Sequence, residues 1–310
     1  MSISLDQFDR ELTTRWLQIA DMDDALLVLQ LADSHLVDPA EPQASAWDYP
    51  SPAWCLEQLD CVIKEINSLS IRPGCILLSG DMTQHGAAVE WNLLFSRLDK
   101  LGNQVVVTLG NHEHRNEQPD STALADSIAS LGSLGAPASQ VPGRYACVHR
   151  IGSWRLIVLD SADRGDLGES QHAWLAQQLA DCQPTIISVH RPVICVDHAV
   201  DQLRLVDPMF DEIIADHDHI AAVVCGHAHR RSVQWRGRHP HFIAPAISFA
   251  NDGHTGYQLL ALAGGRCQWC ATRFLPGLTV QSFRQPPMLQ QENVIWKSMT
   301  SDVFARSGRS

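Results

Sequence analysis

The sequence has no concentration of basic residues, no long apolar run and no internal repeat. Its 23 Lys and Arg residues are outnumbered by 35 Asp and Glu residues, which gives a formal net charge of −12. Binding to a nucleic-acid backbone needs clustered Lys and Arg, so no nucleic-acid partner is expected. A small phosphate substrate stays compatible with this charge, because bound divalent cations can supply positive charge locally.

Membrane and secretory signals are also missing. No apolar run approaches the roughly 20 residues that a membrane helix needs, so no membrane span is expected. Residues 1–6 lack the basic start and apolar core of a secretory signal, which predicts a cytoplasmic protein. The nine cysteines are odd in number and scattered, which indicates reduced thiols rather than a disulfide framework. Cys267 and Cys270 form a Cys-x-x-Cys pair in a stretch typical of a strand, and no second pair completes a zinc site.

What is present is an alternation of apolar runs and helical stretches, which predicts an α/β fold. The 310 residues are 45% hydrophobic and 19% charged, a globular composition. Strands are expected at 26–31, 76–79, 105–109, 154–159, 185–189 and 221–225, and helices near 7–20, 52–69, 87–101, 121–131, 169–181 and 207–216. Shorter alternating strands between 231 and 275 indicate a second sheet or a sheet edge. The predicted catalytic domain covers 1–275, and 276–310 is predicted to be an extension that wraps the domain or a partner, or stays mobile.

Five apolar strands end in side chains that can bind metals. Ile76 to Ser79 is an apolar run followed by Gly80 and Asp81, which reads as a buried strand that brings a carboxylate to the edge of a sheet. The other strands end in the same way. The candidate metal ligands are Asp33, His35, Asp81, Asn111, His190, His227 and His229, with His112 next to Asn111.

Seven candidate ligands exceed what one tetrahedral ion takes, and they suit two ions that share a carboxylate. Asp81 is the natural bridge, because a carboxylate has two oxygens whereas an imidazole offers one nitrogen to a metal. The amide oxygen of Asn111 fits a hard or borderline ion. Iron or manganese is the leading expectation, with zinc, cobalt or magnesium as alternatives.

Each of these residues alone has a simpler interpretation. Asp33 to His35 resembles a helix cap, Asn111 a turn residue, and a single histidine is more often structural than a ligand. His85 and His114 lie near candidate ligands in the sequence, so each could hydrogen-bond to a ligand without binding the metal itself. No function is assigned to the remaining histidines.

The joint pattern is more specific than its parts. Asp33-x-His35, Gly80-Asp81, Gly110-Asn111-His112-Glu113, His190 and Gly226-His227-x-His229, in this order at strand ends, resemble the calcineurin-like metallophosphoesterase superfamily. The resemblance covers about 25–275. Leu29 to Leu36, Leu159-Asp160-Ser161 and Gly226 to His229 look most like bacterial class III cyclic-nucleotide phosphodiesterases.

The resemblance implies a fold and a set of roles. The fold would be a four-layer α-β-β-α sandwich with two facing mixed sheets. The first metal would be held by Asp33, His35, Asp81 and His229, and the second by Asp81, Asn111, His190 and His227. His112 would face the substrate phosphate and act as an acid or orienting donor. Asn111 and His112 are therefore also the expected substrate-binding residues.

Two departures from the family pattern bear on specificity. Relatives often read His-His-Pro where this chain has His190-Arg191-Pro192, so Arg191 changes the charge next to a ligand. Many relatives carry Leu-x-Asn in the following loop, where this chain has Leu203-Arg204-Leu205. These departures affect the expected substrate but not the hydrolase assignment.

The resulting hypothesis is metal-assisted hydrolysis of a phosphodiester. A hydroxide bridging the two ions would attack phosphorus, and His112 would protonate the leaving oxygen. With 3′,5′-cyclic AMP the product would be 5′-AMP. The alternatives are a hydrolase of the same fold acting on glycerophosphodiesters or phospholipid head groups, and a metal-binding scaffold without activity. The native metals, the role of 276–310 and a homodimer are left open.

Overall fold

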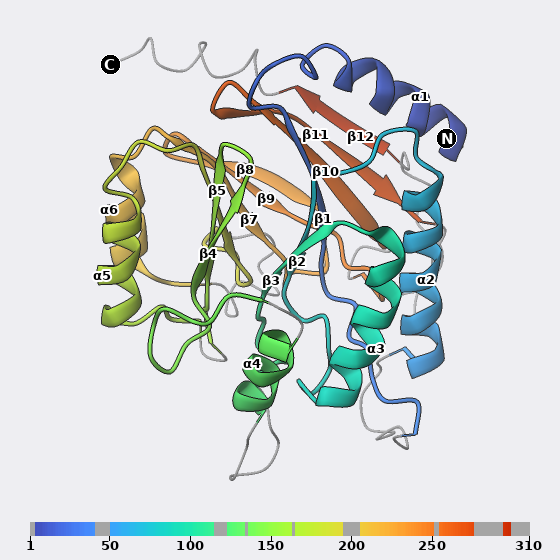
Figure 1. Ribbon diagram of the computed structural model, residues 1–310, viewed down its shortest axis with the longest axis horizontal. Coiled ribbons are helices and arrows are strands. Elements are labelled where there is room, and N and C mark those ends of the chain that lie inside the picture. The colour runs from blue at the N-terminus through green and yellow to red at the C-terminus, as the bar shows by residue number, and fades with distance from the viewer. Residues whose placement is uncertain are drawn as a thin grey trace.

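The computed structural model places two six-stranded sheets face to face, with helices on both outer faces (Figure 1). It describes residues 4–40, 50–114, 123–133, 136–162, 165–194, 205–250, 254–275 and 294–298. One sheet has the order β12-β11-β10-β1-β2-β3 and the other β4-β5-β6-β7-β9-β8. Both contain parallel and antiparallel pairs, so the predicted sandwich of two mixed sheets is confirmed.

The strands of the first sheet, here called sheet A, come from both ends of the chain. They are β1 (Leu26–Leu31), β2 (Cys75–Ser79), β3 (Gln104–Thr108), β10 (Gly256–Ala263), β11 (Arg266–Phe274) and β12 (Val294–Ser298). The second sheet, sheet C, consists of β4 (Cys147–Ile151), β5 (Trp154–Leu159), β6 (Thr185–Val189), β7 (Ile220–Cys225), β8 (Ser232–Arg236) and β9 (His239–Ile243).

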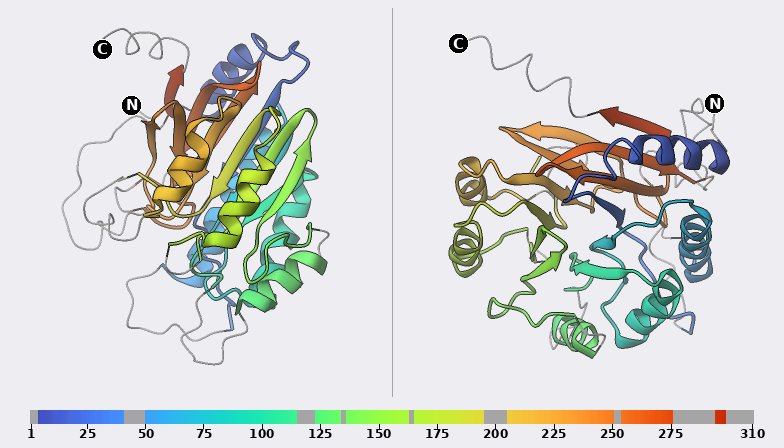
Figure 2. Two further views of the ribbon diagram at one scale, coloured as in Figure 1. Left: turned by 90° about the vertical axis from the view of Figure 1, so that its left-hand side faces the viewer. Right: turned by 45° about the horizontal axis from the view of Figure 1, so that its top comes forward.

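Helices cover the outer face of each sheet. Sheet A packs against α1 (Leu5–Trp16), α2 (Pro52–Ser68) and α3 (Ala88–Leu98), and sheet C packs against α5 (Glu169–Gln178) and α6 (Pro208–Ala215). The right-hand view of Figure 2 shows both sheets between α2 and α3 on one side and α5 and α6 on the other. Helix α4 (Ala123–Ser133) contributes Leu131 to the apolar cluster that contains residues of both sheets.

Helix boundaries follow local capping rather than the hydrophobic pattern alone. The first helix was expected at about 7–20, but it spans Leu5–Trp16 because Ser4 accepts the Gln7 N–H and starts it earlier. Residues 17–20 form turns. Ser51 caps α2 in the same way and Pro52 occupies its first turn, so this helix begins where the sequence predicts.

The described part of the C-terminal extension contains a strand that the sequence did not predict. Val294–Ser298 pairs antiparallel with β11 and extends sheet A at its edge. The rest of 276–310 lies outside the described residues, as do Leu203 and Arg204. The predicted domain limit at 275 stays a prediction.

The topology brings two sets of parallel strands together. In sheet A, β1, β2 and β3 are parallel neighbours, and in sheet C so are β5, β6 and β7. Ligands and catalytic groups of α/β proteins collect at the carboxyl ends of such strands. Here polar contacts join the two sets of ends. His190 after β6 donates to the Ser79 carbonyl of β2 at 2.7 Å, and the His227 backbone N–H after β7 donates to the Asp33 carboxylate at 3.1 Å.

Free thiols and membrane spans bear on two other expectations. Cys267 and Cys270 are buried in β11 and form no disulfide, and burial raises the pKa of Cys267 well above its ordinary value. No described helix is long and apolar enough to cross a membrane. Location in the cytoplasm stays a prediction.

His241 in β9 makes the fold sensitive to acid. Its side chain is fully buried, and neither ring nitrogen has a hydrogen-bond partner among the described residues. Burial, followed by the neighbouring charges of His239 and Arg236, lowers the pKa of His241 to about 3. The unfolded chain takes up this proton below about pH 6.5 while the folded chain does not, so stability falls as pH drops from 6.5 towards 3.

We therefore expect His241→Leu to make folding less sensitive to acid. The unfolding free energy should fall less between pH 8 and pH 5 than in the parent protein, by about 2 kcal/mol, because the variant has no buried imidazole to protonate. Urea unfolding at the two pH values measures this difference. Phe242→Leu, in the same strand, is the control and should keep the parent's acid sensitivity, because it removes no titratable group. An unchanged pH dependence in His241→Leu would contradict the assignment.

Candidate metal centre

The structure brings six of the seven predicted ligands together at the edge where the two sets of parallel strands end, and Asn111 lies on the turn after β3 at the same edge. The donor atoms form three groups, and within each group they all lie within 4.8 Å of one another. The groups are Asp33, His35 and His229; His35, Asp81 and His112; and Asp81, His190 and His227. Asp81 belongs to two of these groups. Residues separated by up to 196 positions in the chain thus form one continuous cluster.

Strained backbone at the strand ends aims these side chains inward. Six described residues other than glycine have positive φ, and five of them are Asp33 (54°), His35 (46°), Asp81 (50°), His227 (68°) and His229 (48°). This conformation is costly for a residue with a Cβ and persists only where surrounding contacts enforce it. Its concentration on the predicted ligands marks this edge as a functional site.

Two glycines leave room for the ligands. A Cβ on Gly80, whose φ is +91°, would lie 2.3 Å from His190 Nδ1. A Cβ on Gly110 would lie 2.2 Å from Asp81 Oδ1. Side chains at these positions would displace the imidazole and the carboxylate that the cluster needs.

Asp81 is a nearly inaccessible carboxylate, 2% exposed. Its Oδ1 accepts the His112 backbone N–H at 2.8 Å, and its Oδ2 lies 3.1 Å from His190 Nε2. Burial raises the pKa of Asp81, but His190 and His112 outweigh that effect and hold the pKa well below its ordinary value. The group is therefore an ionised carboxylate, as a bridging ligand must be.

Hydrogen bonds fix the orientation of three histidine rings. The Nδ1 atoms of His35, His190 and His229 lie 2.9, 2.7 and 3.1 Å from the Gln84 side-chain oxygen, the Ser79 carbonyl and the Phe249 carbonyl. Because oxygen acceptors take the Nδ1 proton, Nε2 is the atom of each ring that can bind a metal. These supporting groups were not predicted, because nothing in the local sequence distinguishes Gln84 or the carbonyl of Phe249.

The remaining donors also fit metal ions. His35 Nε2 and His229 Nε2 lie 3.0 Å apart, and two lone pairs at this distance repel unless a cation lies beside them. Burial, followed by His112 and His229, lowers the pKa of His35 well below its ordinary value, so its ring is neutral. The Asn111 side-chain oxygen is buried and accepts no hydrogen bond from the described residues, as expected of a ligand atom.

His112 lies within the cluster of donor atoms. It is 5% exposed, its Nδ1 lies 3.2 Å from the Gln84 carbonyl and its Nε2 lies 3.9 Å from Asp81 Oδ2. Because the Gln84 carbonyl takes the Nδ1 proton, Nε2 is the atom turned towards the site. It can donate a proton there only in the imidazolium form.

Glu113 supports the turn that begins at Gly110, and the sequence analysis did not identify it as a functional residue. It is fully buried and accepts the backbone N–H groups of Asp81, Thr83 and Gly110 at 3.0, 2.8 and 2.7 Å. Its carboxylate therefore ties the end of β2 to the end of β3. The Gly-Asn-His-Glu pattern was the signal that could have indicated this role.

The two departures from the family pattern lie in different places. Arg191 is nearly buried, and its Nη1 lies 3.1 Å from His227 Nε2, so it adds positive charge beside a predicted ligand. Leu205 is buried in the apolar core beneath α6, with Val193, Phe210 and Ile214 in the same cluster. The position expected to approach the substrate is thus occupied by a core side chain.

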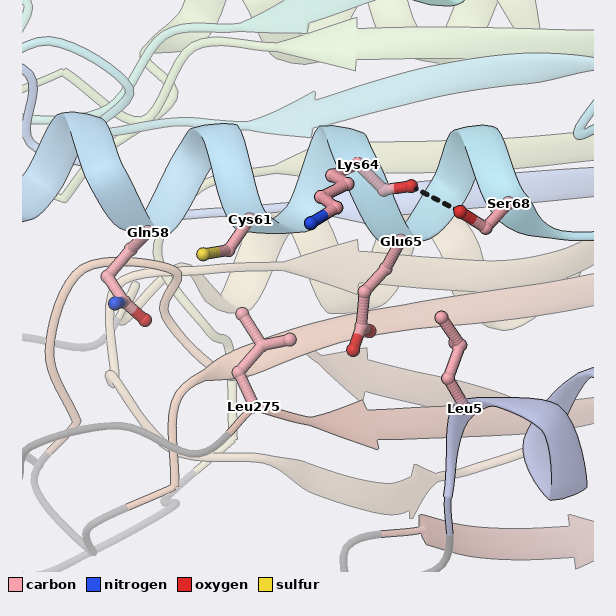
Figure 3. Close-up of a pocket in the computed structure, with 7 residues that line it drawn as sticks. All are labelled: Leu5, Gln58, Cys61, Lys64, Glu65, Ser68 and Leu275. Atoms are coloured by element: carbon pink, nitrogen blue, oxygen red, sulfur yellow. Dashed lines mark hydrogen bonds between the residues drawn. The ribbon is translucent and has the colours of Figure 1, made fainter.

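A separate cavity of about 320 Å³ lies between α1, α2 and the end of β11 (Figure 3). Leu5 and Leu275 line it opposite the α2 residues Gln58, Cys61 and Glu65. None of its lining residues is a predicted ligand, so this cavity is distinct from the metal centre.

Comparison with known proteins agrees with the geometry. The family model of the calcineurin-like phosphoesterases matches residues 26–231, which is more than half of the chain, and all seven predicted ligands lie within this range. The chain belongs to this family. Its members are metal-dependent hydrolases, so the expectation of an enzyme is confirmed, and so is the expectation of divalent metal ions in general terms.

Two relatives are similar to this chain in sequence, and one solved structure is similar to it in fold. The chain is 30% identical to a probable cyclic nucleotide phosphodiesterase of Synechococcus sp., over 73% of this chain and 82% of that protein. It is 24% identical to a probable glycerophosphodiester phosphodiesterase of Arcobacter nitrofigilis, over 67% and 73%. A dimetal phosphatase from Danio rerio has a similar fold, with a TM-score of 0.54 at 13% identity over 82% of this chain and 96% of that one.

We expect Gly110→Ala to disrupt the metal centre, because the added Cβ would lie 2.2 Å from Asp81 Oδ1. Metal content after reconstitution with manganese should fall at least severalfold, as measured by mass spectrometry of the purified protein. Gly132→Ala in α4 is the matched control, since nothing lies within 4 Å of a Cβ there. It should keep full metal content and gain stability, because alanine is the better helix former. Full metal content in Gly110→Ala would contradict the close approach.

Proposed function

We propose that this protein is a phosphodiester hydrolase with a two-metal centre and that 3′,5′-cyclic AMP is its substrate. The observation that carries the proposal is that Asp81 belongs to two buried donor groups, one with His35 and His112 and the other with His190 and His227. A cyclic nucleotide is favoured because the relative with 30% identity is named a probable cyclic nucleotide phosphodiesterase.

In this proposal Asp33, His35, Asp81 and His229 hold one ion, and Asp81, Asn111, His190 and His227 hold the other. Ions bound there would polarise the phosphoryl group and make hydroxide available at neutral pH. Iron or manganese is the proposed metal, and the choice rests on the donor types alone.

The residues of the chain supply position and a proton. Asp81 Oδ1 accepts the His112 backbone N–H, and the Gln84 carbonyl lies 3.2 Å from His112 Nδ1. These two contacts fix the backbone of His112 and the orientation of its ring. His112 Nε2 is the atom proposed to meet the phosphate and to protonate the leaving 3′ oxygen. Asn111 would orient the same phosphate, and cleavage of the P–O3′ bond would give 5′-AMP.

A glycerophosphodiester is the second candidate substrate. It is favoured by the relative of that name and by Leu205, which leaves no amide where the cyclic-nucleotide pattern expects one. An inactive metal-binding scaffold is disfavoured, because His112 and six of the seven proposed ligands lie in one cluster, with Asn111 next to His112 in the chain.

Turnover of a substrate panel tests the proposal. Protein reconstituted with manganese is expected to hydrolyse bis(p-nitrophenyl) phosphate and to convert cyclic AMP to 5′-AMP, as followed by absorbance and chromatography. Activity on the aryl diester and on glycerophosphoethanolamine, with none on cyclic AMP or cyclic GMP, would select the second candidate. Absence of turnover on all of them would reject both.

The shared ligand predicts different effects of two substitutions. Asp81→Ala should lower the metal content from about two ions per chain towards none, whereas His229→Ala should lower it to about one. Elemental analysis after reconstitution measures both. Asp218→Ala, at an exposed carboxylate, should keep the parent's content. Full occupancy in Asp81→Ala would count against a bridging carboxylate.

A further inference from the structure

A buried histidine–aspartate hydrogen bond joins the two sheets beside His112, and the sequence analysis did not connect its two residues, His114 and Asp160. His114 Nε2 lies 2.7 Å from Asp160 Oδ1, and the two side chains are 8% and 0% exposed. His114 follows β3 of sheet A, whereas Asp160 directly follows β5 of sheet C. The pair therefore connects the ends of strands that do not hydrogen-bond to each other.

Asp160 is a firmly held anchor. Its Oδ2 accepts the Tyr145 backbone N–H and its Oδ1 accepts that of Ala162, both at 2.8 Å. Its own backbone N–H and carbonyl pair with the amide of Gln171 in α5, at 2.8 and 2.9 Å. Ala162 also has a positive φ, 49°. The other described residues with positive φ are glycines or proposed ligands.

The other end of the pair lies on the turn that carries the reactive groups. The His114 backbone N–H donates to the Asn111 carbonyl at 3.2 Å, and two residues separate His114 from Asn111. On the sheet A side, this turn is held by the bond of the His112 N–H to Asp81 and by Glu113. His114 provides the matching attachment to sheet C.

We propose that His114 is a positioning residue for phosphodiester hydrolysis. Its hydrogen bond to Asp160 fixes the turn 110–114 between the two sheets and so holds the His112 ring and the Asn111 amide towards the substrate phosphate. His114 itself contacts neither the substrate nor the metals. This inference rests on the proposed function, because it assigns the reaction to the same cluster.

A second histidine–aspartate pair serves as a matched control. His172 Nε2 lies 2.8 Å from Asp207 Oδ2, and these side chains are 17% and 8% exposed. This pair joins α5 to the start of α6, in the helix layer over sheet C. The substitution His172→Ala removes a similar interaction and leaves the contacts of the turn 110–114 in place.

The experiment compares His114→Ala, His114→Gln and His172→Ala with the parent protein, after reconstitution with manganese. Glutamine can place a side-chain N–H near the position of Nε2 and so keep the donor to Asp160. Four quantities are measured: metal content, kcat and KM for bis(p-nitrophenyl) phosphate, thermal unfolding, and hydrogen exchange of the peptide that contains 110–114.

We expect His114→Ala to keep its metals and to lose about 10- to 100-fold in kcat, the usual effect of losing a supporting hydrogen bond behind a metal site. KM should change by less than about threefold, and exchange of the 110–114 backbone should become faster. His114→Gln should recover most of the rate and the protection. His172→Ala should lose thermal stability but keep kcat and the exchange of this peptide.

Several results would overturn the inference. They are an unchanged kcat or unchanged exchange in His114→Ala, a loss of metal that matches the loss of rate, an equal loss of rate in His172→Ala, or no recovery in His114→Gln. Lack of turnover by the parent protein is a different result, because it rejects the proposed function. The exchange measurement still tests whether His114 holds the turn in that case.

Discussion

The buried charge of Asp81 is the constraint on which the arrangement of this edge depends. A carboxylate removed from water is costly unless donors or cations surround it. Here the His112 N–H meets one oxygen, His190 lies beside the other, and Glu113 binds the backbone of the same residue. These groups come from both sheets, so the sheets must meet with their strand ends aligned. Packing of the apolar faces brings the sheets together, and the polar contacts around Asp81 select one alignment.

The turns that follow the strands also make the edge of the sheets with the donor cluster rigid. The proposed ligands Asp33, His35, Asp81, His227 and His229 all have positive φ, and contacts between strand ends hold them there. The His35 N–H, for example, donates to the Asp81 carbonyl, and the Asp33 N–H to that of Gly80. Strain of this kind is maintained by the rest of the fold, and it aims ligands before any ion binds. A preorganised cluster of donors would lose little conformational freedom on taking up metal.

Much of the fold and of the site could be predicted from the sequence. Apolar runs such as Leu26–Leu31 and Ile220–Cys225 are buried on both faces and were recognised as strands, and the polar residues after them are the cluster. Other features had no local signal. Gln84, the Phe249 carbonyl and Asp160 act through partners far away in the chain, and β12 follows a segment without periodicity. Leu205 could not be placed either, because a leucine after a loop is equally compatible with a core or a surface position.

The order of residue types along the chain determined the family, the strand ends and the chemistry of the donors, because these depend on hydrophobic periodicity and on which side chains follow each strand. Only the tertiary structure decided which ring nitrogen each histidine offers, which glycines give the ligands room, and that His114 is tied to Asp160. The reason is physical. A hydrogen bond or a close approach depends on where two distant segments meet, and that position is set by the packing of the two sheets.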